Sequence, residues 1–140
     1  MKRVLDTNVW LDLLVFEDSR VARLADLDGP VLATEPMLQE FAIVLARPNF
    51  ALDAAQLATL LARQRSLVTV CAPAPDCRLA CTDRNDQMFI DLAVAHRADW
   101  LITRDKALLR LARHASRRFG LRIGTPESLA LGPARPLDGA

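Results

Sequence analysis

The chain lacks the features that several common classes of protein require. Its longest apolar runs fall well short of the about 18 residues needed to cross a bilayer, and its short N-terminal apolar run has no signal-peptide cleavage site. It has no glycine-rich phosphate loop, which argues against nucleotide binding of the Rossmann or P-loop kind. We therefore expect a cytoplasmic protein with a native start and no membrane partner.

Histidine, cysteine and tyrosine are also scarce. The chain has two histidines, three cysteines and no tyrosine. Neither His96 nor His114 has a nucleophile in a recognisable context, which argues against Ser-His-Asp or Cys-His catalysis. The cysteines lack the paired spacing of a zinc site, so we expect reduced thiols in or near the core. Without tyrosine, and with Trp10 and Trp100 expected in the core, aromatic stacking on bases has little support.

The composition is otherwise that of one globular domain. The chain has 140 residues, of which 51% are hydrophobic and 25% charged. The net charge of +1 hides an asymmetry: residues 1–60 carry nine acids and five bases, whereas residues 61–140 carry eight acids and thirteen bases. This distribution permits a polyanionic partner without requiring one.

Short β-rich runs alternate with helical periods along the chain. The pattern predicts strands at 3–7, 31–34, 67–71, 100–103 and 121–125. It predicts helices at 9–27 (broken), 36–46, 54–66, 86–98 and 105–116, and a helical turn at 126–131. This alternation is typical of βαβ units, so we expect a three-layer α/β/α sandwich with a central, mostly parallel sheet. We expect one domain over 1–131 and a loose tail at 132–140.

Four carboxylates fall near the ends of the expected strands. Asp6 ends the first strand, Glu40 lies early in the helix after the second, and Asp105 follows the fourth. Asp86 lies in the first turn of the helix before the fourth strand and shares its buried stripe, whereas Asp91 projects away and is expected to be solvated. Parallel sheets bind ligands at the carboxyl ends of their strands, so these acids are expected at one edge.

Each acid has an ordinary structural explanation when taken alone. Asp6 and Asp105 could cap helices, Asp86 could serve a helix dipole, and Glu40 could be a helix former on a boundary. Four carboxylates at one edge would repel and raise one another's pKa, however, and Mg²⁺ or Mn²⁺ would remove that repulsion. Phosphoryl or phosphodiester displacement is the chemistry that most needs such a cluster.

With these residues in hand, the chain resembles a PIN domain, of the type found as VapC-like toxins of bacterial toxin–antitoxin pairs. The resemblance covers about residues 2–130. Its ordered motifs are VLDTNV with Asp6 and Asn8, MLQEFAIVLARPNF with Glu40, CTDRNDQMFIDLAVAHRADWLITRD with Asp83, Asp86, Thr103 and Asp105, and RIGTPESL.

The resemblance implies a Mg²⁺- or Mn²⁺-dependent endoribonuclease, often a homodimer and often silenced by a cognate antitoxin. It implies that Asp6, Asp86 and Asp105 ligate metal, with Glu40 a ligand directly or through water. It makes Asn8, Asp83 and Thr103 accessory residues. Residues 84–87 read RNDQ where this subtype usually has a proline followed by acids, so occupancy of a second metal site stays open.

A basic segment follows the fourth acid. Lys106, Arg110, Arg113 and Arg117 recur at a spacing that places them on one face of the expected helix. With Arg104 they are candidate contacts to an RNA backbone. The commoner explanation for such a stripe is a solvated amphipathic helix.

Other functions remain as alternatives. A haloacid-dehalogenase-like phosphatase would need an acid where Asn8 stands, and a receiver-like module would need an acid where Cys71 ends the third strand. A housekeeping RNA-processing PIN nuclease would share the same acids as a toxin. A degenerate PIN module that acts only through protein contacts would usually be expected to lose one of them.

Overall fold

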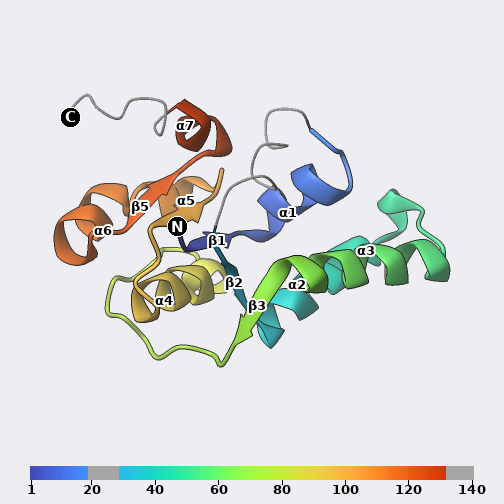
Figure 1. Ribbon diagram of the computed structural model, residues 1–140, viewed down its shortest axis with the longest axis horizontal. Helices are drawn as coiled ribbons and strands as arrows, with labels where there is room; N and C mark the ends of the chain where they lie inside the picture. The colour runs from blue at the N-terminus through green and yellow to red at the C-terminus, as the bar shows by residue number, and fades with distance from the viewer. Residues whose placement is uncertain (19–28, 132–140) are drawn as a thin grey trace.

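The computed structural model describes residues 1–18 and 29–131, and within them five strands form one parallel sheet. The strand order is β3-β2-β1-β4-β5, so β1 is central and β4 is its neighbour on one side (Figure 1). The strands are β1 (Arg3–Leu5), β2 (Val31–Thr34), β3 (Val68–Cys71), β4 (Trp100–Ile102) and β5 (Arg122–Gly124). The predicted α/β/α sandwich is confirmed, and every strand pairing in it is parallel.

In residues 1–18 and 29–131, seven α-helices connect and cover these strands. They are α1 (Thr7–Leu14), α2 (Glu35–Leu45), α3 (Ala54–Leu67), α4 (Gln87–Ala95), α5 (Lys106–Leu109), α6 (Ala112–Phe119) and α7 (Pro126–Leu131), with 3₁₀ turns η2 (Pro48–Phe50) and η3 (Arg84–Asp86). Local sequence explains several ends: Asp53 and Gln56 form a capping box at α3, and Gly120 ends α6 at a φ of 67°. The expected helical segment 19–27 and the tail 132–140 lie outside the described residues.

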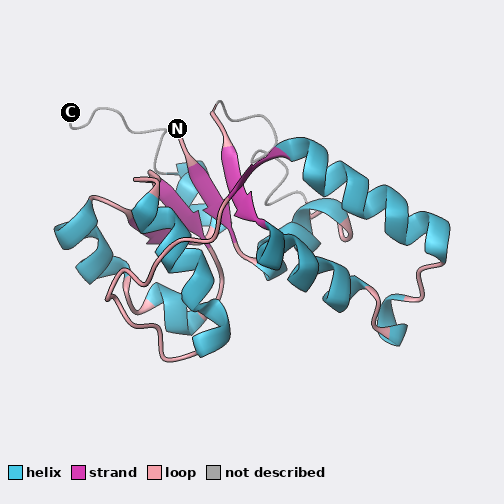
Figure 2. Ribbon diagram, turned by 90° about the horizontal axis from the view of Figure 1, so that it is seen from below, coloured by secondary structure: helices cyan, strands magenta, loops and turns pink. Residues whose placement is uncertain are grey.

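Alternating strand residues divide the core between the two faces of the sheet. Val4 and Leu101 pack with α4 and α6 on one face, whereas Leu5 and Ile102 pack with α1 and α7 on the other. Helices α2 and α3 pack against each other and extend to one side of the sheet (Figures 1 and 2). No helix in the described ranges is long and apolar enough to cross a membrane.

The single helix expected at 105–116 is wrong, because the chain breaks there into α5 and α6. The Leu111 N–H donates to the carbonyl of Leu108, three residues back, at 3.0 Å, and this tightened turn ends α5. Lys106 and Arg110 therefore do not share one helix face with the basic residues of α6. The basic stripe becomes two short groups of exposed side chains.

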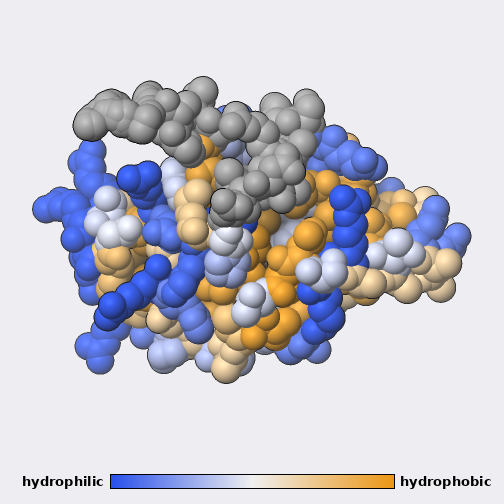
Figure 3. Space-filling view, in the orientation of Figure 1, coloured by the Kyte–Doolittle hydropathy of each residue, from blue (hydrophilic) through white to orange (hydrophobic). Residues whose placement is uncertain are grey.

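The two sides of the molecule present different surfaces. Hydrophilic side chains gather over the side of α4 to α6, whereas hydrophobic ones gather toward α2, α3 and β3 (Figure 3). Ile43, Leu67 and Val70 are among the large hydrophobic residues exposed there. Both tryptophans are buried, as expected.

Candidate metal centre

The first part of the site lies at the ends of strands β1 and β4. Asp6 follows β1 and caps α1, since its Oδ1 accepts a hydrogen bond from the Val9 N–H at 2.9 Å. Its own N–H donates to the carbonyl of Ile102 on β4 at 3.2 Å, which places Asp6 beside the end of that strand. Asp6 is only 4% exposed. It therefore serves as a helix cap and also lines the candidate site described below.

Thr103 connects the ends of the two central strands. Its buried hydroxyl donates to Asp6 Oδ2 and accepts from the Asp105 N–H, the second at 2.9 Å. Asp105 in turn caps α5 by accepting from the Ala107 N–H at 2.7 Å. The hydroxyl thus links the Asp6 carboxylate to the backbone of Asp105. We call Asp6, Thr103 and Asp105 the strand-end half of the site.

Asp83 and Asp86, which we call the loop half, come from the segment that joins β3 to α4. Asp83 begins η3 by accepting from the Asn85 N–H at 3.0 Å, and Asp86 ends it. Within the described part of the chain, the buried Asp86 Oδ2 has no hydrogen-bond partner. Asp83, Asp86 and Asp105 each offer one oxygen, and these atoms lie within 4.8 Å of one another. An all-oxygen donor set with an unpartnered buried oxygen fits a hard divalent cation.

The four acids singled out in the sequence line one cavity of about 260 Å³. The acids are Asp6, Glu40, Asp86 and Asp105, and the cavity is also lined by Asn8 and Arg47. The compact trio of oxygens includes Asp83, expected only as an accessory, rather than Asp6 or Glu40. The structure therefore brings the four expected acids to one cavity, and it groups Asp83 with Asp86 and Asp105 as possible metal ligands.

Burial and nearby negative charges raise the pKa values of three of the four acids that line this cavity, and the pKa of Asp105 is lowered. Burial is the largest cause that raises the pKa of Asp6 from 3.8 to about 6, and the charges of Asp105 and Glu40 add to it. Burial also raises the pKa of Asp86, to about 8, with further contributions from Asp105, Asp83 and Asp6. The hydrogen-bonding contact with Asp86 is the largest cause that lowers the pKa of Asp105. Burial likewise raises the pKa of Glu40.

A pair of polar side chains on α4 holds the loop half in place. Gln87 accepts from the Cys81 N–H at 2.7 Å and donates to the Leu79 carbonyl at 3.1 Å and to Asp91 Oδ1 at 2.9 Å. Asp91 also accepts from the Cys77 N–H at 3.1 Å. We call Gln87 and Asp91 the loop clamp.

The solvated position expected for Asp91 is wrong, since it is 8% exposed. Residues 72–83 pass over that face of α4, and their backbone N–H groups need acceptors. The i, i+4 spacing of Gln87 and Asp91 was the available signal, because such pairs share a helix face. Helix periodicity alone could not show that a loop covers it.

Arg104 has partners inside the protein. Its Nε donates to Asp12 on α1 at 3.0 Å, and its Nη1 donates to Glu127 on α7 at 2.8 Å. These ion pairs argue against Arg104 as an RNA contact, because binding RNA would have to break them. Lys106, Arg110, Arg113 and Arg117 are exposed, and their contact with RNA stays a prediction.

The protein is an α/β protein with carboxylates at the carboxyl edge of a parallel sheet. Such a site can hold a divalent cation. The sequence model of the PIN domain family matches residues 2–107, and the chain belongs to this family. PIN domains are generally metal-dependent nucleases, so the chain has a nuclease-type fold. A search of curated proteins found no match.

Proposed function

We propose that this protein is a divalent-metal-dependent endoribonuclease that hydrolyses phosphodiester bonds of RNA. The observation that carries the proposal is one cavity lined by four carboxylates, one of which has a buried oxygen without a hydrogen-bond partner among the described residues. Holding such a cluster without a cation is costly, as the raised pKa values of Asp6 and Asp86 indicate. The PIN domain match supplies the nuclease class.

The proposed role of each residue follows from its position in the cavity. Asp83, Asp86 and Asp105 would hold Mg²⁺ or Mn²⁺, with Asp6 and Glu40 on the adjoining walls of the cavity. When bound, such a cation activates water and neutralises charge on a phosphate. Thr103 orients Asp6 and Asp105 through its hydroxyl.

Two further side chains of the cavity suit a phosphate. Arg47 and Asn8 are exposed residues that line it, and both can donate hydrogen bonds to phosphate oxygens. They would place the scissile group against the carboxylates. This would give Asn8, which the resemblance implies is an accessory residue, a role in binding.

The biological role that we propose is that of a toxin in a toxin–antitoxin pair, acting as a homodimer. The family resemblance supports it. The check is growth arrest when the chain is expressed alone, relieved by co-expression of a small neighbouring gene. Harmless expression would favour a housekeeping RNA-processing nuclease with the same site.

The activity is tested by cleavage of labelled single-stranded RNA with Mg²⁺, Mn²⁺ or EDTA. Two matched variants sharpen the test, because Asp6 and Asp53 are both helix caps and asparagine caps a helix about as well as aspartate. We expect Asp6→Asn to lower the cleavage rate by at least about a thousandfold, and Asp53→Asn to leave it unchanged.

Both variants should unfold at temperatures close to that of the wild type. Full activity in Asp6→Asn, or cleavage that persists in EDTA, would contradict the proposed site. Absence of cleavage by folded wild-type protein with every metal and RNA tried would favour a non-catalytic module.

A further inference from the structure

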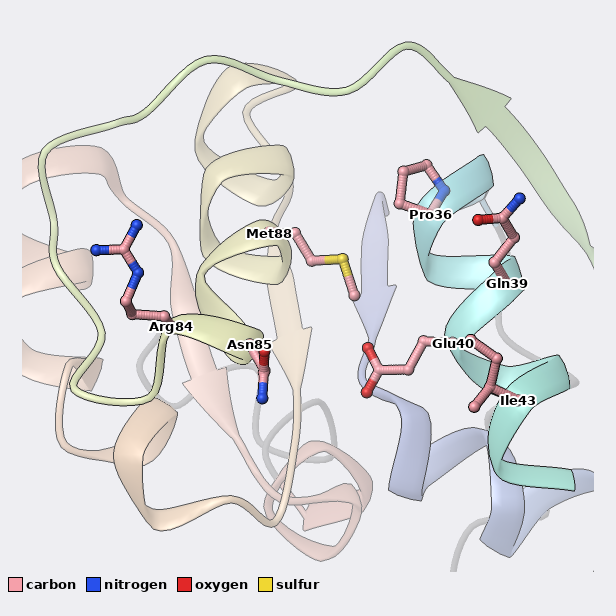
Figure 4. Close-up of a pocket in the computed structure, with 7 residues that line it drawn as sticks. All are labelled: Pro36, Gln39, Glu40, Ile43, Arg84, Asn85 and Met88. Carbon is pink, nitrogen blue, oxygen red and sulfur yellow. The ribbon is translucent and has the colours of Figure 1, made fainter. Parts of the chain in front are cut away.

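A second hollow adjoins the carboxylate cavity. It is a cleft of about 470 Å³ between α2 and the start of α4, and Glu40 lines both spaces (Figure 4). The cleft is lined by Pro36, Gln39, Glu40, Ile43, Arg84, Asn85 and Met88. Its volume lies within the range of about 300–1,000 Å³ that is usual for small-molecule sites.

Apolar groups form two opposite walls of this cleft. Met88 reaches from α4 toward α2, where Pro36 and Ile43 stand on the far side (Figure 4). Ile43 is 66% exposed, so its side chain is accessible to a ligand in the cleft. The Glu40 side chain extends from α2 into the space between Ile43 and Met88 (Figure 4), and the apolar groups on both sides of it can pack against a flat ring. A thioether makes favourable contacts with aromatic rings.

The cleft is also bordered by polar side chains that have no hydrogen-bond or ion-pair partner among the described residues. Neither Gln39 nor Asn85 uses its side-chain amide in a hydrogen bond to any other described residue, and both are exposed. Each amide offers one acceptor and two donors, the combination that reads the edge of a base. Arg84 forms no ion pair with another described residue and is available for a phosphate.

We propose that this cleft binds one unpaired nucleobase of the RNA, next to the phosphate that lies against the carboxylates. The base packs against Met88 and Ile43 beside the Glu40 side chain, and the Asn85 and Gln39 amides contact its edge. Asn85 directly precedes Asp86, so the base site and the carboxylates are joined by one short piece of chain. This proposal rests on the proposed nuclease function. It adds that the RNA substrate must carry an unpaired base next to the phosphate at the carboxylates.

The test compares RNA that carries bases with RNA that does not. Fluorescent tetranucleotides of adenosine, cytidine, guanosine and uridine are titrated against the Asp6→Asn protein with Mn²⁺, beside an abasic ribose-phosphate of the same length. We expect at least one base-bearing tetranucleotide to bind about tenfold more tightly than the abasic one. Ile43→Ala and Met88→Ala should each reduce this ratio several-fold and leave the affinity for the abasic strand unchanged.

Leu67→Ala is the matched control, since Leu67 is also an exposed aliphatic residue on a helix. It should retain the full ratio, and thermal unfolding checks that each variant is folded. Equal affinity for base-bearing and abasic strands would overturn the proposal, as would a ratio that Ile43→Ala and Met88→Ala leave unchanged. Because binding is measured without cleavage, a lack of nuclease activity in the wild type would leave this result readable on its own.

Discussion

The strand-end half and the loop half of the site are held by different means. Asp6, Thr103 and Asp105 are fixed by β1, β4 and the first turns of α1 and α5, with hydrogen bonds to backbone and hydroxyl groups. Asp83 and Asp86 lie at the two ends of η3, and the loop that leads into η3 is bonded to the loop clamp of Gln87 and Asp91. The strand-end half is therefore held directly by the sheet, whereas the loop half is held through a loop.

The two halves also differ in how much each needs a cation. Hydrogen bonds from Thr103 and Val9 offset part of the burial that raises the pKa of Asp6. Asp86 has a buried oxygen without a partner among the described residues, and its pKa is raised further, to about 8. A cation would therefore stabilise the loop half more than the strand-end half.

The largest effect that we expect is on the pH dependence of metal binding. Asp86 must lose its proton to ligate a cation, so affinity should rise about tenfold per pH unit from pH 6 toward 8. A second, weaker dependence below about pH 6 would come from Asp6. Calorimetric titration with Mn²⁺ from pH 5 to 9 measures both. Asp86→Asn should abolish the upper step, and a flat profile in the wild type would contradict the assignment.

Stability without metal should have the opposite slope. The folded pKa values of Asp6 and Asp86 lie above their ordinary value of 3.8, so the folded chain binds more protons than the unfolded chain between about pH 4 and 8. The contribution of these groups to the free energy of unfolding is therefore present at low pH and lost as pH rises. Denaturant unfolding in EDTA at pH 5 and pH 8, in wild type and Asp86→Asn, measures it. Adding Mn²⁺ should stabilise the wild type more at pH 8.

Removing the hydroxyl of Thr103 should damage the strand-end half. Thr103→Val leaves Asp6 Oδ2 and the Asp105 N–H without this partner, and we expect metal affinity to fall about 10- to 100-fold. The free energy of unfolding should fall by about 1–3 kcal/mol. Thr59→Val is the control, because its hydroxyl bonds only to the Ala55 carbonyl on the exposed face of α3. Unchanged affinity in Thr103→Val would show that the two carboxylates do not need the bridge.

Removing the loop clamp should damage the loop half by a smaller factor. Gln87→Ala loses the hydrogen bonds to Leu79, Cys81 and Asp91, and we expect metal affinity to fall about tenfold as the segment carrying the acids loosens. Gln56→Ala is the control, since it removes a helix cap far from the site. It should lower stability and leave metal affinity unchanged. Equal metal affinities in the two variants would mean that the clamp does not position the acids.

The smallest effect concerns the basic residues outside both halves. Arg113→Ala and Arg117→Ala should each weaken RNA binding by about fivefold or less and lower the salt dependence by about one ion. Arg63→Ala, an exposed arginine on α3, should change neither. A salt dependence that is identical in all three variants would show that α6 is an ordinary solvated helix.

The difference between the strand-end half and the loop half also explains what could be predicted from the sequence. The strand-end acids follow from two rules, the alternation of strands and helices and the binding of ligands at the carboxyl edge of parallel strands. Asp86 was found through the helix that it precedes. The break between α5 and α6 and the burial of Asp91 were missed, because a tightened turn and a covering loop depend on tertiary contacts. The bridging role of Thr103 could not be predicted from the sequence, because it depends on the distance between the ends of two strands.

The most direct test of the central claim is the stoichiometry and affinity of Mn²⁺ binding to the purified protein, measured by calorimetry at pH 8 without RNA. The convergence of the carboxylates predicts saturable binding that is lost or strongly weakened in Asp86→Asn and Asp105→Asn and retained in Asp53→Asn. The stoichiometry would also decide between one and two cations. No binding to folded wild-type protein, or equal binding to all of these variants, would contradict the account.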